Sequence, residues 1–170
     1  IFLLFLIISS RILVKPAFHY IIVECITKTR VLTMDKFYSI LENTGHVYLL
    51  DSIIWEKAIK RLSKWKKNGR EDLFISINIS AKDMFYVNVY DVLTKYIEMY
   101  DVNPKNLKIE IKETSLMDNI IEFMELFEQL QEYGFDIEID DFGLGYSSLN
   151  MLKDINADYL KLDVGFLDSD

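Results

Sequence analysis

The stretch from Asp136 to Asp163 constrains the fold of this chain more than any other part of the sequence. It begins with alternating apolar and acidic residues, which predict a strand that ends in an Asp-Asp pair. A loop with two glycines follows, then a short predicted helix over 149–154 and a strand over 159–163 with Lys161 in its middle. A strand, a helix and a strand in so few residues imply parallel pairing, so the stretch predicts an α/β fold.

The preceding residues also predict a series of strands and helices. Strands are predicted over 11–18, 20–26, 73–80 and 107–112, and helices over 34–43, 48–67, 91–100 and from Asp118 to Gly134. A closed barrel of parallel strand–helix units has eight strands and typically about 250 residues. We therefore expect an incomplete TIM-like (β/α) barrel with about six of the eight strands, the first of them antiparallel.

The composition limits the class of partner and the compartment. Half of the residues are apolar, so the chain has enough material for a packed core. The net charge of -8 argues against a surface for nucleic-acid polymers, which needs clustered Lys and Arg. The single cysteine, Cys25, excludes an internal disulfide and is typical of a reducing cytoplasm.

An uninterrupted apolar run covers residues 1–8. It is too short to cross a membrane, which takes roughly 20 apolar residues. Three interpretations stay open: the end of a buried strand or helix, the tail of a membrane helix cut off upstream, or a short translated remnant. We therefore separate an apolar N-terminal segment, 1–10, from a domain over 11–170, and expect membrane contact only if 1–8 ends a membrane helix. A start at Ile1 rather than Met indicates a processed or trimmed product or a fragment.

Residues with side-chain oxygens lie near the C-terminal ends of the predicted strands, where barrels of this type build their sites. They are Glu24, Asn78, Glu110, Asp140 and Asp141. Hard oxygen ligands suit Mg²⁺, Mn²⁺ or Ca²⁺, and with Asp140 shared, two ions would lie side by side as in phosphodiester cleavage. The alternative is that these residues are structural and that the Asp-Asp pair only solubilises a turn.

Several charged residues have two interpretations. Glu24 lies in an apolar run, so it either marks the open end of a strand or has a function, because burial of a lone Glu is costly. Lys161 either orients an attacking water and balances phosphate charge, or extends its stem toward solvent. The basic cluster at Lys64, Lys66 and Lys67 is interpreted as a solvated helix end.

The sequence resembles the EAL domain, the bacterial phosphodiesterase domain of cyclic di-GMP signalling. Residues 140–149 are similar to the DDFGxGxSSL segment of the family almost letter for letter. Residues 76–80, 109–114 and 159–163 resemble three further strand motifs, in the family's order and at family-like intervals. The resemblance covers roughly 14–170 and implies metal-dependent hydrolysis of cyclic di-GMP to the linear dinucleotide, with Mg²⁺ or Mn²⁺.

The resemblance also implies roles for single residues. Asn78, Glu110 and Asp140 would ligate one metal, Asp140 with Asp141 a second, and Glu24 would belong to the same set.

Outside the metal set, Lys161 would hold the nucleophilic water and Lys28 would contact substrate. Glu113 would brace the loop over 142–148, through which a homodimer would form.

The chain also departs from the family pattern. Glu24-Cys25-Ile26 stands where the family has Glu-Ala-Leu, and Lys28 where it usually has Arg. No counterpart of the last two strands, with a catalytic Glu and a substrate-contacting Gln, follows Asp163. We therefore expect these 170 residues alone to be inactive. Three interpretations stay open: a fragment of an active cytoplasmic or membrane-anchored phosphodiesterase, a catalytically dead module that binds cyclic di-GMP or a protein, or a truncated pseudogene product.

Overall fold

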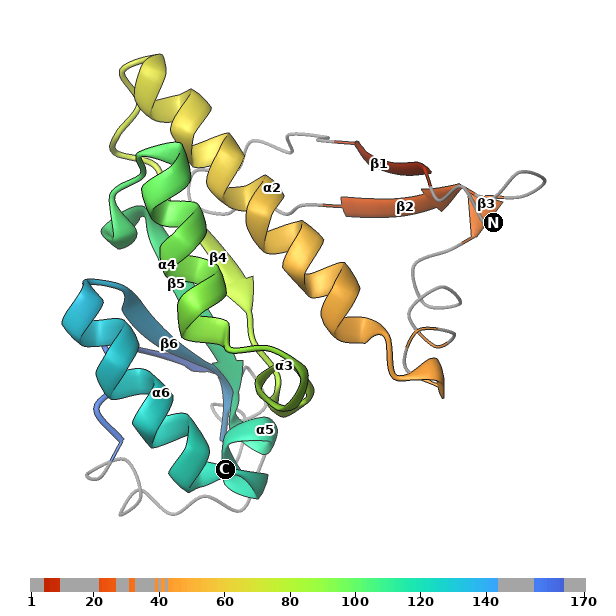
Figure 1. The fold of residues 1–170 in the computed structure, drawn as a ribbon. Helices are drawn as coiled ribbons and strands as arrows, with labels where there is room; N and C mark the ends of the chain where they lie inside the picture. The colour runs from red at the N-terminus through yellow and green to blue at the C-terminus, as the bar shows by residue number, and fades with distance from the viewer. Residues whose placement is uncertain are drawn as a thin grey trace. The chain divides into compact units, whose positions relative to one another are not determined.

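The structure, a computed structural model, describes residues 5–9, 22–26, 31–32, 39, 41, 43–143 and 155–163. The chain divides into two compact units, Ile1–Val47 and Tyr48–Asp170 (Figure 1). The N-terminal unit contains an antiparallel sheet and the C-terminal unit a parallel one.

The sheet of the N-terminal unit has three strands. Strands β1 (Phe5–Ser9), β2 (Ile22–Ile26) and β3 (Val31–Leu32) follow one another in it, with Ile7 opposite Glu24. The apolar run at the N-terminus thus contains a strand. The strand predicted over 11–18 and most of the helix predicted over 34–43 lie outside the described residues.

The C-terminal unit is built on a parallel sheet in the order β4-β5-β6-β7. The strands are β4 (Ile75–Asn78), β5 (Leu107–Lys112), β6 (Asp136–Phe142) and β7 (Tyr159–Leu162). The predicted α/β class with parallel pairing is therefore confirmed. The barrel of six strands with an antiparallel first strand stays a prediction.

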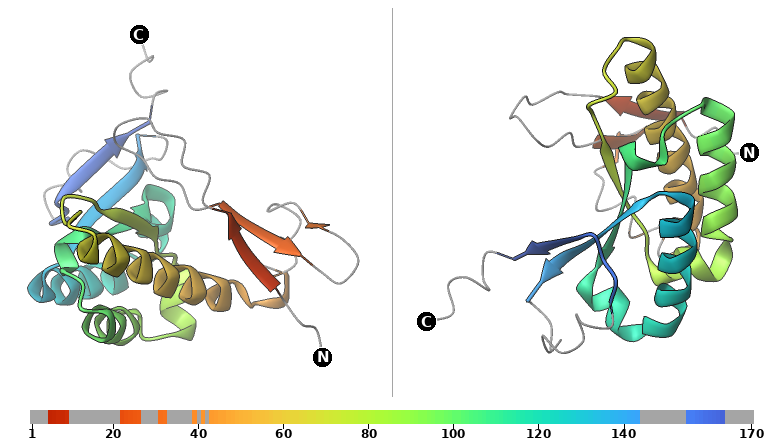
Figure 2. Two further views of the ribbon diagram at one scale, coloured as in Figure 1. Left: turned by 90° about the horizontal axis from the view of Figure 1, so that it is seen from above. Right: turned by 90° about the vertical axis from the view of Figure 1, so that its left-hand side faces the viewer.

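The helices of the C-terminal unit connect these strands and lie together on one face of the sheet (Figure 2). They are α2 (Val47–Lys67), α3 (Ala81–Tyr86), α4 (Val89–Tyr100), the 3₁₀ turn η1 (Pro104–Asn106), α5 (Glu113–Asp118) and α6 (Ile120–Tyr133). The helix predicted from Asp118 to Gly134 begins later than expected, because a separate short helix ends at Asp118 and α6 begins after Asn119. Among the residues described, none of the helices combines the length and hydropathy needed to cross a bilayer.

The core lies between the helices and one face of the sheet. Every second residue of β5 faces the helices, and Leu107, Ile109 and Ile111 are fully buried there. Trp55 of α2 is 1% exposed and donates its indole N–H to the Asn78 carbonyl oxygen at 3.1 Å. Since strand side chains alternate between faces, the residues between these apolar positions point to the opposite face. That face carries the polar side chains.

Gly134 ends α6 with a φ of 115°, where an L side chain is strained. A Cβ at this position would also lie 3.1 Å from Pro104 Cγ. We therefore expect Gly134→Ala to lower the free energy of unfolding by about 2 kcal/mol, measured by urea denaturation. Gly69→Ala is the matched control, because Gly69 has a φ of 72° but open space around it. A loss no larger than that of the control would show that Pro104 does not restrict this turn.

Candidate functional site

The polar face of the parallel sheet brings residues from all four strands into one layer. In register, Asn78 lies beside Glu110, Glu110 beside Glu138, and Lys112 beside Asp140. Neighbours in a parallel register point to the same face, so these side chains share one surface at the carboxyl ends of the strands. In α/β folds this edge is the usual position of a binding site.

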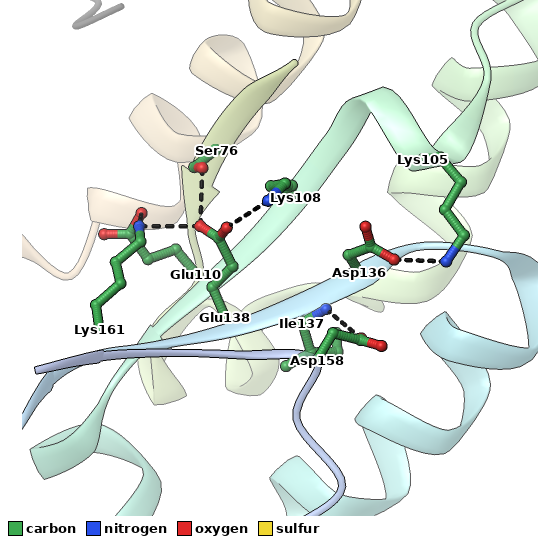
Figure 3. A network of polar contacts seen from close by, with 9 residues as sticks. All are labelled: Ser76, Lys105, Lys108, Glu110, Asp136, Ile137, Glu138, Asp158 and Lys161. Atoms are coloured by element: carbon green, nitrogen blue, oxygen red, sulfur yellow. Dashed lines mark hydrogen bonds and ion pairs between the residues drawn. The ribbon is translucent and has the colours of Figure 1, made fainter. Parts of the chain in front are cut away.

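Glu110 and Lys161 form a close ion pair on this surface, with Lys161 Nζ 2.5 Å from Glu110 Oε2 (Figure 3). Burial raises the pKa of Glu110, and the nearby Asp140 carboxyl raises it further, while Lys161 opposes both. For Lys161, burial lowers the pKa, but hydrogen bonds to Glu110 and Glu138 outweigh it and raise the pKa. Two carboxyl groups and an ammonium therefore meet at the end of β5.

Asp141 lies at an irregularity of β6. The register with β7 shifts between Ile139 and Phe142, and Asp141 has a φ of 55°, rare for a residue other than glycine. Bulges of this kind redirect side chains next to functional sites. Here Asp141 Oδ2 accepts a hydrogen bond from Lys112 Nζ at 2.9 Å, which raises the pKa of Lys112.

Glu113 is the buried residue that links β5 to the segment after β6. It is 1% exposed, and its Oε2 accepts a hydrogen bond from the Gly143 backbone N–H at 2.9 Å. The contact fixes the beginning of the 142–148 loop against the start of α5. Bracing of the 142–148 loop by Glu113 stays a prediction.

The structure thus brings together Glu110, Asp140 and Lys161. Asn78 is exposed beside Glu110, and Asp141 pairs with Lys112.

Two predicted residues belong to the N-terminal unit. The backbone of Glu24 lies in β2, its side chain is outside the described structure, and Lys28 lies outside the described residues altogether.

Among the residues described, no group of three His, Cys, Asp or Glu side chains is arranged to hold a metal ion. Glu110 and Asp141 each pair with a lysine, whose ammonium supplies positive charge at the carboxylate. The donor set nevertheless fits a hard cation, because Asp140 lies close enough to Glu110 to raise its pKa. Mutual repulsion of two such carboxylates is relieved by a divalent ion as well as by a lysine.

The same polar face also carries three residues outside the predicted set, further from the strand ends: Ser76, Lys108 and Glu138. Glu138 is 3% exposed and contacts two lysines of the face, Lys108 and Lys161. The signal was present in the alternation of the two strands, since Lys108 lies two residues before Glu110 and Glu138 two before Asp140.

Comparisons with known proteins agree on one family. The profile of the EAL domain matches residues 26–170. The chain is 31% identical over 137 residues to the bifunctional diguanylate cyclase/cyclic di-GMP phosphodiesterase MucR of Pseudomonas aeruginosa, covering 81% of this chain and 20% of MucR. It is 34% identical over 133 residues to the signaling protein YkoW of Bacillus subtilis, covering 78% of this chain and 16% of YkoW.

A solved structure extends this similarity to three dimensions. The PaMucR phosphodiesterase in its c-di-GMP complex superimposes with a TM-score of 0.76 at 28% identity, covering 88% of this chain and 62% of that one. The chain therefore spans a fifth or less of the length of the two curated relatives and less than two thirds of this solved domain.

Proposed function

This chain belongs to the EAL domain family, and from that premise we propose that its sheet supplies part of a two-metal phosphodiesterase site for cyclic di-GMP. The observation that carries the proposal is the meeting of Glu110, Asp140 and Lys161 at the carboxyl ends of adjacent parallel strands. Relatives named as cyclic di-GMP phosphodiesterases support the choice of ligand.

The proposed metal ligands are Asn78, Glu110 and Asp140 for one ion and Asp140 with Asp141 for a second. The family resemblance adds Glu24 to this proposed set. When bound, Mg²⁺ or Mn²⁺ would activate water and stabilise the leaving oxygen of a phosphodiester.

The remaining proposed roles concern water, substrate and the loop. The Lys161 ammonium would orient the attacking water, and Lys28 would contact a phosphate of the substrate. Glu113 would fix the 142–148 loop, which we propose as the dimer contact. We place the domain in the cytoplasm, because its single cysteine, Cys25, is typical of a reducing compartment.

We further propose that these 170 residues do not hydrolyse cyclic di-GMP by themselves, because they carry no counterpart of the family's catalytic Glu beyond Asp163. The alternative function is that of a catalytically dead module that binds cyclic di-GMP or a protein partner. Glu24-Cys25-Ile26 in place of the signature tripeptide favours this alternative.

The test is calorimetry and product analysis on the purified chain with Mn²⁺ and cyclic di-GMP. We expect measurable Mn²⁺ binding that Asp140→Asn weakens at least tenfold, weak or no binding of the dinucleotide, and no linear product. Asp163→Asn, which changes a neighbouring strand end without removing a proposed ligand, is the matched control.

Each other outcome has a defined meaning. Turnover that disappears in Asp140→Asn would refute the proposed inactivity. Micromolar binding of cyclic di-GMP without turnover would establish the binding module. Mn²⁺ affinity that is equal in the wild type and in Asp140→Asn would refute the metal site.

A further inference from the structure

A buried carboxylate, Glu138, lies at the centre of the polar face of the sheet. Its Oε1 accepts a hydrogen bond from Lys108 Nζ at 2.9 Å, and its Oε2 is 2.9 Å from both Ser76 Oγ and Lys161 Nζ (Figure 3). We call Ser76, Lys108, Glu138 and Lys161 the Glu138 cluster. It joins all four strands of the sheet, one residue from each.

The cluster holds its charges in a fixed geometry. Glu138 is 3% exposed, and the Lys108 side chain is 11% exposed. The Lys108 ammonium also lies 3.7 Å from the ring centroid of Tyr159 and 4.3 Å from that of Phe74, within cation–π range. Because Lys108 and Ser76 already donate to Glu138, its carboxylate loses little further freedom when Lys161 binds.

Lys161 therefore has two carboxylate partners with different surroundings. Glu110 lies at the strand end beside Asp140, within the proposed metal site, whereas Glu138 lies deeper between Lys108 and Ser76. A cation bound to Glu110 would compete with the Lys161 ammonium for the same oxygen and repel it. Glu138 faces no such competition, because its partners are donors.

We propose that Glu138 is a positioning residue. It keeps Lys161 at the site when Glu110 binds a metal ion. This inference rests on the proposed function for the metal, and it adds a residue that the known motifs of the chain do not include. With Glu138 in place, Glu110 exchanges Lys161 for the metal ion, and Lys161 keeps the Glu138 carboxylate as its partner. Without Glu138, metal binding to Glu110 removes the last carboxylate partner of Lys161.

Burial alone would raise the pKa of Glu138, but the hydrogen bonds from Lys108, Lys161 and Ser76 outweigh it and lower the pKa. Lys108 and Ser76 hold the Glu138 carboxylate in place for Lys161.

The test compares Glu138→Gln with Asp136→Asn, which removes a carboxylate charge two residues earlier in the same strand. Asp136 pairs with Lys105, whose side chain is 60% exposed, and not with Lys161. In metal-free protein, the pKa of the Lys161 ammonium, followed by NMR, is expected to fall by about one pH unit in Glu138→Gln only. Mn²⁺ affinity is expected to fall five- to tenfold in Glu138→Gln and to stay unchanged in Asp136→Asn.

Glu138→Asp separates contact from charge, because it keeps the carboxylate but withdraws it by one methylene. We expect it to lose most of the Mn²⁺ affinity that Glu138→Gln loses. Wild-type affinity in Glu138→Asp, or an unchanged Lys161 pKa in Glu138→Gln, would overturn the positioning role.

Two complications are covered by the same measurements. If Glu138→Gln does not fold, the double variant Lys108→Met/Glu138→Gln removes the unpaired lysine as well and has the same expected results. If the wild type binds no Mn²⁺, the proposed metal site fails, and the Lys161 pKa still decides whether Glu138 holds this lysine.

Discussion

Replacing Asp51 with Asn is expected to stabilise the C-terminal unit by about 1–2 kcal/mol more at pH 8 than at pH 5. The reason is a pair of carboxyl groups between α2 and α3. Asp83 is 1% exposed, and its Oδ2 accepts hydrogen bonds from the backbone N–H and the hydroxyl of Ser80. Asp83 Oδ1 is buried without a hydrogen-bond donor among the described residues, and a side-chain hydrogen bond joins Asp83 and Asp51.

The direction of the pH dependence follows from this shared proton. Burial, and then the charge of Asp83, raise the pKa of Asp51 from 3.8 to about 7. The folded state therefore binds a proton that the unfolded state releases, and the stability contributed by this group falls as pH rises from about 4 to about 7. Among the described residues, Asp83 is the charged group that acts on Asp51. We expect the amide N–H of an Asn at this position to donate to Asp83 throughout this pH range.

Urea unfolding followed by tryptophan fluorescence at pH 5, 6, 7 and 8 measures the effect. Asp72→Asn is the control, because Asp72 is exposed and pairs only with the exposed Arg70 in the described structure. The free energy of unfolding of Asp72→Asn is expected to stay within about 0.5 kcal/mol of the wild-type value from pH 5 to pH 8. A constant difference between Asp51→Asn and the wild type across this range would contradict the shared proton.

The regular elements of the C-terminal unit were predictable because their signals are local. The alternation in 107–112 predicts β5 with its observed bounds, and Gly134 marks the end of α6. The two short helices that follow strands were missed for different reasons. Before α3, Ser80 and Asp83 form a capping box, a motif that can be recognised in the sequence. In contrast, α5 begins directly after β5 without a side-chain cap, so no residue marks its start.

The candidate site was predictable to the extent that it depends on register. Strand-end positions alone imply that Glu110, Asp140 and Lys161 lie near one another, and the parallel pairing places them so. The partner of each long side chain depends on rotamers and depth, which a linear pattern does not contain. The sequence therefore suggests Glu110 and Asp141 as metal ligands, but not their ion pairs with Lys161 and Lys112.

Lys108→Met is expected to lower the free energy of unfolding by about 2–3 kcal/mol, a larger loss than the removal of an exposed lysine causes. The Lys108–Glu138 pair is almost completely buried, with side chains 11% and 5% exposed. Removing one member of such a pair leaves a buried charge with less compensation, although Lys161 and Ser76 still contact Glu138. Met fills a similar volume, so the loss reports the charge and not a cavity.

A double-mutant comparison separates the pair from its packing. In Lys108→Met/Glu138→Leu no uncompensated carboxylate is left in the cluster, and we expect at least half of the lost stability to return. Lys105→Met is the control for lysine removal as such, because Lys105 pairs with Asp136 but its side chain is 60% exposed, and a loss under about 1 kcal/mol is expected. Equal losses in Lys108→Met and Lys105→Met would contradict the claim that burial makes the Glu138 cluster a structural centre of the sheet. A double variant less stable than Lys108→Met would show instead that Glu138 is sufficiently compensated by Lys161 alone.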